Sequence, residues 1–240
     1  ARQLTLRDHQ CFIDIPVFDL MNKKLVGEDE DESQSLTSLP AVAHWIKQFN
    51  DINMLAATWI LKETSASRRV RMIEWVIGLL VKLRSMQNFQ SVMAILGALK
   101  CSSVYRLKKT WLTVSKTKKK QYNEIVAEMA HTNNSARYRS LLVECDPPLV
   151  PFLGTCLSDL TFIEDGNPDN LSSGYVNFTK RRLMGRVISE LRSFQCCSYP
   201  FRYVGEINEL IDQIKPMDEN EQYQASLLIE PRAKNPPGKN

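Results

Sequence analysis

The sequence predicts an all-α fold, and three observations carry that prediction. Apolar residues recur at three- and four-residue steps along most of the chain, which is the spacing of one face of an α-helix. The alternating pattern of a half-buried strand is almost absent, and its nearest case, residues 11–15, is short and borderline. With 240 residues, 43% apolar and 24% charged, the chain has the size and composition of a globular protein. Collagen-like, low-complexity and wholly disordered proteins are therefore excluded.

Helix start signals divide the first half of the chain. Ser38 is a suitable N-cap and Pro40 suits a first turn, ahead of a long run of apolar positions at helical spacing. Ser67 is the expected cap of the next helix, which is apolar on nearly all sides and is therefore expected to be a central, buried element. Asn88 is expected to start a third helix. A basic amphipathic helix is expected from Trp111 through Met129.

A helical hairpin is expected over about residues 151–195, after a short helix around residues 138–143. Its first helix is expected from Pro151 to about Glu164 and its second from about Asn177 to Gln195. Residues 165–169 concentrate turn-forming residues, which end one helix and separate the pair. The inward face of the second helix is expected to comprise Phe178, Leu183, Val187, Leu191 and Phe194.

Charge and targeting signals indicate a soluble chain in a reducing compartment. The acidic run Glu28–Glu32 is expected to be an exposed loop, and residues 233–240 a disordered tail. No signal-peptide pattern opens the chain, and the longest apolar run is far below the ~20 residues that span a bilayer. The six cysteines are scattered, as free thiols are. We expect a cytoplasmic protein and, because the chain begins abruptly, an excised fragment.

Motifs for bond-making chemistry are missing from the sequence. It contains no Gly-rich phosphate loop, no H-E-x-x-H and no C-x-x-C motif. His9, His44 and His131 lie in unrelated contexts, so a metal site would need distant residues to converge. We therefore expect no metal site, no cofactor and no enzyme in the covalent sense.

Two basic clusters remain without an assignment. One joins Arg106–Lys109 to Lys116–Lys120, and the other joins Lys180–Arg182 to Arg186. Each is either a solvated helix face or a contact for an acidic protein, an anionic lipid or a nucleic acid, and nothing local decides among these. The net charge of +4 is too mild to require a nucleic-acid partner.

A series of sequence blocks, in order along the chain, gives a pattern that is specific to one family. The longest is residues 150–169, followed by residues 176–182. Seven further blocks complete the series: Leu4–Leu6, Phe49-Asn50, Asn88–Ile95, Tyr105–Trp111, Tyr138-Arg139, Asp146–Pro148 and Ser226–Arg232. Together they closely resemble the catalytic domain of Ras-family guanine-nucleotide exchange factors. The resemblance implies that residues 1–232 form this domain, a single globular helical unit from which the hairpin at about 151–195 protrudes.

The resemblance also implies an activity and a partner. Such a domain promotes GDP release from a small GTPase of the Ras, Rap or Ral type, without any change in covalent bonds or need for a cofactor. Its hairpin inserts near the first switch region and the phosphate and Mg²⁺ site of the GTPase. Nucleic acid is not an expected partner. Membrane contact is expected only indirectly, through recruitment by the GTPase or by domains missing from this chain.

The family's catalytic positions are occupied by Thr161, near the metal, and Asp165, near the phosphate. The two are four residues apart and therefore share one helix face. Some relatives have a bulky apolar residue in place of Thr161 and a longer acid in place of Asp165. Several relatives also have an aromatic residue at Asn134-Ser135 that grips the second switch region of the GTPase.

Other positions are implied to bind the GTPase or to support the hairpin. The expected GTPase-binding residues are Asn50, Lys100, Tyr105 and Phe152, with Phe152 at the root of the hairpin. Lys180, Arg181 and Arg182 match a triplet expected to hold the hairpin helix in place.

Two alternatives to an active exchange factor stay open. The first is a GTPase-binding scaffold of the same fold with weak or no exchange activity, suggested by Thr161, Asp165 and Ser135. The second is a basic helical module that binds nucleic acid or membrane.

Overall fold

A computed structural model describes residues 1–21 and 40–232, and its regular elements there are all helices. They are α1 (Arg2–Ile13), α2 (Val17–Met21), α4 (Pro40–Leu61), α5 (Ala66–Ser85), α6 (Phe89–Lys100), α7 (Ser102–Tyr105), α8 (Lys108–Thr113), α9 (Lys116–Glu128), α10 (Thr132–Glu144), α11 (Leu153–Gly166), α12 (Phe178–Ser193), the 3-10 helix η3 (Phe194–Cys196), α13 (Gly205–Gln213) and α14 (Glu219–Ile229). The prediction of an all-α fold is confirmed. The acidic run, the expected cap Ser38 and the tail 233–240 lie outside the described residues.

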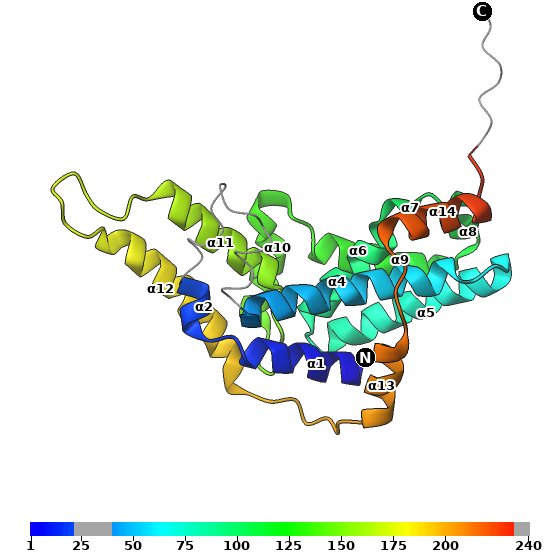
Figure 1. Ribbon diagram of the computed structural model, residues 1–240, viewed down its shortest axis with the longest axis horizontal. Helices are drawn as coiled ribbons and strands as arrows, with labels where there is room; N and C mark the ends of the chain where they lie inside the picture. Colours follow the sequence, from blue (N-terminus) through cyan, green and yellow to red (C-terminus); the bar gives the residue numbers. More distant parts are fainter. Residues whose placement is uncertain (22–39, 233–240) are drawn as a thin grey trace, which may run out of the picture.

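The helices form an elongated molecule with the hairpin at one end (Figure 1). The hairpin helices α11 and α12 project from the body, and α7, α8 and α14 lie at the opposite end. Both hairpin helices begin and end within two residues of the bounds expected from the sequence.

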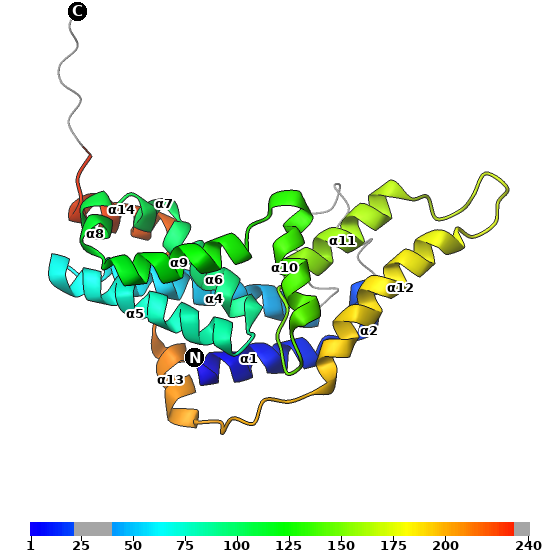
Figure 2. The ribbon, with the colours of Figure 1, turned by 180° about the vertical axis from the view of Figure 1, so that it is seen from behind.

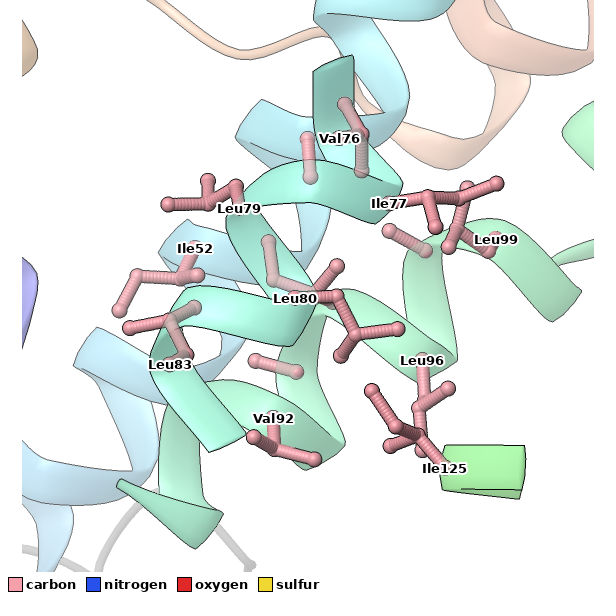
Figure 3. Close-up of a cluster of buried hydrophobic side chains, with 14 of the residues drawn as sticks. Ile52, Val76, Ile77, Leu79, Leu80, Leu83, Val92, Leu96, Leu99 and Ile125 are labelled. Atoms are coloured by element: carbon pink, nitrogen blue, oxygen red, sulfur yellow. The ribbon is translucent and has the colours of Figure 1, made fainter. Parts of the chain in front are cut away.

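The larger hydrophobic core joins α4, α5, α6 and α9. Five α5 side chains have no exposed surface: Ile73, Val76, Ile77, Leu80 and Leu83. In Figure 3 the α5 side chains meet Ile52 of α4, Val92 and Leu96 of α6, and Ile125 of α9. Helix α5 is therefore a central element, as the sequence predicted.

A second core lies at the base of the hairpin. Phe12 of α1 stacks on Trp45 of α4 with ring centroids 5.3 Å apart, and both rings are fully buried. Leu160 of α11 and Ile188 of α12 join this cluster. The hairpin is thus rooted in a core of its own, which α1 and α4 share.

Residues 11–15, the nearest case to a strand pattern, agree with the all-α prediction, because α1 continues through Ile13 and buries Phe12. Other expectations about individual helices are wrong. The cap of α5 is Ser65 in extended backbone, whereas Ser67 is already helical. Helix α5 is not buried all round, since Trp75 is 54% exposed. Trp111 belongs to the separate helix α8 because Ser115 caps a new helix, accepting a hydrogen bond from the backbone N–H of Lys118.

The inward face of α12 also differs from the expected one. Phe178 is 71% exposed, whereas the buried residues are Lys180, Met184, Ile188 and Leu191. This set follows the same helical period as the expected one but is rotated around the helix. The buried face of α12 can include Lys180 because this lysine is paired with Glu164 and Asp169. A prediction based on apolar residues alone does not include a lysine.

Asp8 joins α1 to α4 and α6 inside the protein. Its carboxylate is fully buried and accepts hydrogen bonds from the Gln48 and Asn88 side-chain amides, each at 2.7 Å, and from the Ser91 hydroxyl. Desolvation raises the pKa of Asp8, and these hydrogen bonds together with the charge of Arg7 offset the rise only in part. The folded protein therefore holds this proton to higher pH than the unfolded chain does.

Asp8 is expected to make the protein less stable as pH rises. A carboxyl whose folded pKa is raised binds more protons in the folded state, so the free energy of unfolding falls as pH climbs from the unfolded value of about 4 through the folded value. Denaturant titrations of the native chain and of Asp8→Asn across that range measure this. The variant is less stable overall because its amide meets hydrogen-bond donors. The free energy of unfolding should fall more steeply with pH for the native chain than for Asp8→Asn. Parallel pH dependences in the two proteins would show that Asp8 does not have a raised pKa.

Candidate functional site

The hairpin carries Thr161 and Asp165 on its first helix, toward the projecting end. The Thr161 side chain is half-buried, and its hydroxyl donates a hydrogen bond to the backbone oxygen of Leu157 at 2.9 Å. Asp165 is exposed in the last turn of α11 and has no hydrogen-bond or ion-pair partner among the described residues. Their spacing places both on one face of the helix.

The position of Asp165 is electrostatically unfavourable for the helix that carries it. The C-terminal end of an α-helix bears a partial negative charge, and the last turn of α11 contains no basic residue. The neighbouring Glu164 differs, because its carboxylate is paired with Lys180 at 2.8 Å. The charge of Asp165 is thus not used by the described part of the fold and is available to a partner.

Lys180 lies inside the hairpin, where it connects both helices and the loop between them. Its side chain is 2% exposed, and its Nζ lies 2.8 Å from Glu164 of α11 and 3.0 Å from Asp169 of the loop. Arg181 reaches the same Asp169 oxygen at 2.8 Å, whereas Arg182 is exposed. The structure therefore separates the triplet into two paired members and one that points to solvent.

Two opposing effects act on the Lys180 ammonium. Desolvation lowers its pKa, but hydrogen bonds to Glu164 and Asp169 and the charges of both carboxylates outweigh it, so that the pKa is raised overall. Lys180 is therefore charged at neutral pH. Its pair of carboxylates compensates the cost of burying that charge.

The loop of the hairpin is held by its own hydrogen bonds. The Asn177 side chain caps α12 and donates to the backbone oxygen of Pro168 at 2.9 Å, while its backbone N–H donates to Asp169 at 2.8 Å. The turn closes with Gly174 N–H donating to the oxygen of Leu171 at 2.8 Å. Gly174 has φ of +83°, a conformation that side chains other than glycine's rarely adopt. These bonds fix the geometry of the projecting end.

Phe152 lies at the root of the hairpin, as the N-cap residue of α11. Its half-buried ring contacts Phe49 of α4 at 5.9 Å and His131 at 6.3 Å between centroids. Its backbone N–H donates to the hydroxyl of Tyr138 at 2.7 Å. The ring also lies against Gly154, where an added Cβ would collide with it. The ring is therefore held in one place, with part of its surface open.

The remaining predicted GTPase-binding residues are all exposed. Asn50 follows Phe49 on α4, Lys100 ends α6, and Tyr105 ends α7 with 59% of its surface exposed. The Nζ of Lys108 lies 3.3 Å from the centre of the Tyr105 ring, a cation–π contact. The elements that carry these residues follow the long axis of the molecule from the hairpin to α7 (Figure 1). They are spread over α4, α6, α7 and the root of the hairpin, and so extended a set suits a macromolecular partner better than a small substrate.

A pair that the sequence did not assign braces the hairpin from outside. Arg139 of α10 makes two hydrogen bonds to the carboxylate of Asp159 on α11, both at 2.8 Å. This pairing raises the pKa of Arg139. The block Tyr138-Arg139 was conspicuous in the sequence, but no local pattern connects it to Asp159. The two residues meet only because α10 packs beside the hairpin.

The Arg139–Asp159 pair is expected to contribute about 1 kcal/mol to the free energy of unfolding, as is usual for a bidentate arginine–carboxylate pair in a partly exposed site. A double-mutant cycle with Arg139→Gln and Asp159→Asn, followed by denaturant unfolding, measures this coupling energy. The exposed pair Lys47–Asp51, at 2.5 Å on α4, is the control and should couple more weakly. Equal coupling energies in the two pairs would show that the Arg139 contact adds nothing specific to the hairpin.

Asn134 and Ser135 lie in a left-handed stretch of backbone at the start of α10. Residues 133–135 have φ between 49° and 54°. Ser135 is buried, and its hydroxyl lies 3.2 Å from Nδ1 of His131. Ser135 therefore presents no side chain to a partner at the position where several members of the resembled family have an aromatic.

The rest of the described chain offers few other kinds of site. Within residues 1–21 and 40–232 no group of three or more His, Cys, Asp or Glu side chains is arranged to hold a metal ion. All six cysteines are free thiols. None of the helices described is both long and apolar enough to cross a lipid bilayer.

Comparisons with known proteins bear on this arrangement. The model of the RasGEF domain family matches residues 1–182. The chain is 35% identical over 233 residues to human Ras-specific guanine nucleotide-releasing factor 1, a match that covers 97% of this chain and 18% of that protein. It is 36% identical over 235 residues to Ras guanine nucleotide exchange factor J of Dictyostelium discoideum, covering 98% of this chain and 28% of that protein.

The chain thus spans less than a third of the length of either relative. The family match nevertheless covers most of the chain and includes the hairpin through the triplet that ends at Arg182. Both relatives align with nearly all of the residues described above. This helical protein with a projecting hairpin belongs to the RasGEF domain family.

Proposed function

We propose that residues 1–232 are the catalytic domain of a guanine-nucleotide exchange factor, which promotes GDP release from a GTPase of the Ras, Rap or Ral type. The observation that carries this proposal is Asp165, an exposed carboxylate in the last turn of α11 with no ion pair among the described residues. Family membership supplies the class of partner. No covalent bond changes in such a reaction.

The hairpin acts by competing with the nucleotide for its binding site. A GTPase holds the nucleotide through backbone amides and a lysine that contact the phosphates, together with Mg²⁺. When the hairpin inserts near the first switch region, the Asp165 carboxylate offers an alternative negative charge to those groups. The Thr161 hydroxyl is engaged with the backbone of its own helix, so this residue contributes bulk rather than charge.

The remaining predicted residues form the docking surface and the support of the hairpin. Phe152, Asn50, Lys100 and Tyr105 bind the GTPase outside the nucleotide site. An aromatic ring that is held in place and partly exposed is a common binding anchor, because it adds contact area at low entropic cost. Lys180 and Arg181 hold the hairpin together through Asp169. Recruitment to a membrane follows from binding a membrane-attached GTPase.

The test is the release of a fluorescent GDP analogue from purified Ras, Rap and Ral proteins in excess unlabelled nucleotide. Acceleration on at least one member is expected, and the pattern across the panel identifies the substrate. Binding to a nucleotide-free GTPase without acceleration would instead support the scaffold reading, which the buried Ser135 and the short Thr161 favour. If the protein is folded and helical but neither binds the GTPase nor accelerates GDP release, both the exchange-factor and the scaffold proposals are overturned.

Asp165→Asn is expected to slow GDP release more than it weakens binding to the nucleotide-free GTPase. The carboxylate competes with phosphate, which is absent from the nucleotide-free complex, so its loss affects mainly the step in which GDP leaves. Release rates and the affinity for nucleotide-free GTPase, measured on the same variant, check this. Equal losses in the two measurements would show that Asp165 is an ordinary contact residue.

A further inference from the structure

The structure separates the two basic clusters that the sequence leaves equivalent. In the hairpin cluster, Lys180 and Arg181 are paired with carboxylates at 2.8 to 3.0 Å. In the other cluster, Lys116 and Lys119 have no ion pair among the described residues. Two of the four hairpin cations are therefore used by the fold, while Arg182 and Arg186 are exposed; the one ion pair described for an α9 lysine is the exposed Lys120–Glu124 contact at 3.9 Å.

The positive charge here forms one surface, which we name the lysine face: Lys116, Lys119 and Lys120 of α9 and Arg137 of α10, with Leu112 of α8 at its edge. The three lysines and Arg137 line one shallow depression together with Asn123 and Ala127. The Nζ of Lys119 donates to the backbone oxygen of Leu112 at 3.0 Å, which brings α8 to the edge of the same surface. Figure 2 shows α9 lying along the body between α8 and α10.

Acidic residues on this surface do not neutralise it. The same depression is lined by Glu124 and Glu128. Glu128 is engaged with Arg84 of α5 at 2.6 Å, and Glu124 lies 3.9 Å from the Nζ of Lys120, with both of those side chains more than half exposed. One partly screened carboxylate thus faces three lysines and an arginine, and the surface stays basic.

The lysines are placed where they do not help their own helix. The N-terminal end of a helix carries a partial positive charge, so acidic residues are favoured in the first turn and lysines are disfavoured. Helix α9 has Lys116, Lys118 and Lys119 in that turn and no acidic residue. Helix stability does not account for this arrangement, whereas an anionic partner does.

Leu112 adds an apolar contact to this basic surface. Its side chain is 78% exposed at the end of α8, next to the lysines of α9. The neighbouring Trp111 is not part of that contact, because its indole N–H donates to the oxygen of Val104 at 3.1 Å and its ring packs on Tyr122. The surface therefore combines several cations with one exposed aliphatic side chain, and none of the residues that line it is aromatic. The exposed ring of Tyr105 lies outside it on α7, with the first lysine of α8 over its face.

We propose that the lysine face binds directly to an anionic lipid bilayer. Clusters of lysine and arginine are attracted to the negative surface of membranes that contain phosphatidylserine or phosphoinositides, and a neighbouring aliphatic side chain enters the interfacial region. A single-stranded nucleic acid would instead favour aromatic stacking platforms beside the cations, and a duplex, which is bound through its phosphates, is distinguished by the test below. The face lies on α8, α9 and α10, whereas the hairpin projects beyond α10, so its tip is free to contact the GTPase while the face meets lipid (Figures 1 and 2).

The proposal is tested without any GTPase, so its result is independent of exchange activity. The protein is mixed with vesicles of phosphatidylcholine alone or with about 30% phosphatidylserine, and bound protein is measured by flotation. Binding is expected only with the anionic vesicles and should weaken as salt rises. No binding to anionic vesicles at low salt would overturn the proposal.

Charge and apolar contact are tested by separate variants. The triple variant Lys116→Gln, Lys119→Gln, Lys120→Gln should lose about 100-fold in vesicle affinity, the sum of three juxtamembrane charges. Leu112→Ser should lose about 10-fold. The matched control Arg186→Gln, Arg192→Gln, Lys215→Gln removes three exposed positive charges elsewhere and should bind almost as well as the native chain.

Two outcomes would overturn the lipid assignment. Equal losses in the two triple variants would mean that overall charge, not this face, attracts the vesicles. Equally tight binding to a DNA or RNA duplex at the same salt, lost in the lysine variant and unaffected by Leu112→Ser, would assign the face to nucleic acid. The lysine substitutions are at exposed or half-exposed positions and should leave the helical circular-dichroism spectrum unchanged.

Discussion

Replacing Lys180 by methionine is expected to lower the free energy of unfolding by about 2–3 kcal/mol and to loosen the hairpin. Methionine keeps most of the length of the side chain but leaves Glu164 and Asp169 without their cation. Removing one partner of a fully buried pair costs about 3–5 kcal/mol, and we expect less because these carboxylates are 21% and 30% exposed. Denaturant unfolding measures the change in the free energy of unfolding. Amide hydrogen exchange at residues 167–177 measures how much more often the hairpin loop opens.

Arg182→Met is the matched control for this prediction. It removes the same charge two positions along the same helix, from an exposed side chain with no ion pair among the described residues. Its effect should stay within about 0.5 kcal/mol, which is usual for a surface position. If both variants were equally stable, the buried pair would not hold the hairpin, and the support role proposed for Lys180 would be wrong.

The two substitutions also separate stability from exchange. A loosened hairpin positions Asp165 less well, so Lys180→Met should slow nucleotide release more than it weakens GTPase binding through the root of the hairpin. Arg182→Met should leave the hairpin geometry unchanged. A release rate that is lower for Arg182→Met than for Lys180→Met would place Arg182 in contact with the GTPase rather than in the support of the hairpin.

Local sequence patterns were sufficient to predict the helices but not how they contact one another. The sequence predicts that Asn88 starts a helix, and its side chain caps α6 by accepting a hydrogen bond from the backbone N–H of Ser91. The hairpin was predictable because two apolar periods flank a run of turn formers. Both signals depend on residues within a few positions of each other.

The errors and omissions concern contacts between distant segments. The inward face of α12 was misplaced because a buried lysine reads as a surface residue until its partners on α11 and in the loop are known. The bond between Arg139 and Asp159 depends on how α10 packs beside α11, which no periodicity encodes. The candidate GTPase-binding residues came from the family resemblance, since exposed residues such as Asn50 and Lys100 carry no local signal of their own.

Phe152→Ala is expected to weaken binding to the nucleotide-free GTPase by more than about 1 kcal/mol, or roughly fivefold or more. The ring is held by Phe49 and His131 with part of its surface open, so its loss removes contact area in the complex. It also removes packing within the domain, and some loss of stability is expected. Calorimetric or fluorescence titration at a temperature where the variant is folded gives the affinity.

Gly154→Ala tests the position of the ring without removing it. A Cβ at Gly154 would overlap the Phe152 ring, so the ring must move, whereas the helix itself tolerates or favours alanine. Weaker GTPase binding is therefore expected, with a smaller loss of stability than Phe152→Ala causes, because the ring is displaced and not removed. That combination would separate the ring's contact with the GTPase from its packing in the domain.

Gly185→Ala is the control for the effect of alanine on a hairpin helix. Nothing lies within 4 Å of a Cβ at Gly185, so this change should stabilise α12 by up to about 1 kcal/mol and leave affinity unaltered. If Gly154→Ala bound the GTPase as well as Gly185→Ala did, the orientation of the Phe152 ring would not matter for docking. The anchor would then have to be sought among the exposed residues Asn50, Lys100 and Tyr105, whose side chains depend on neither glycine.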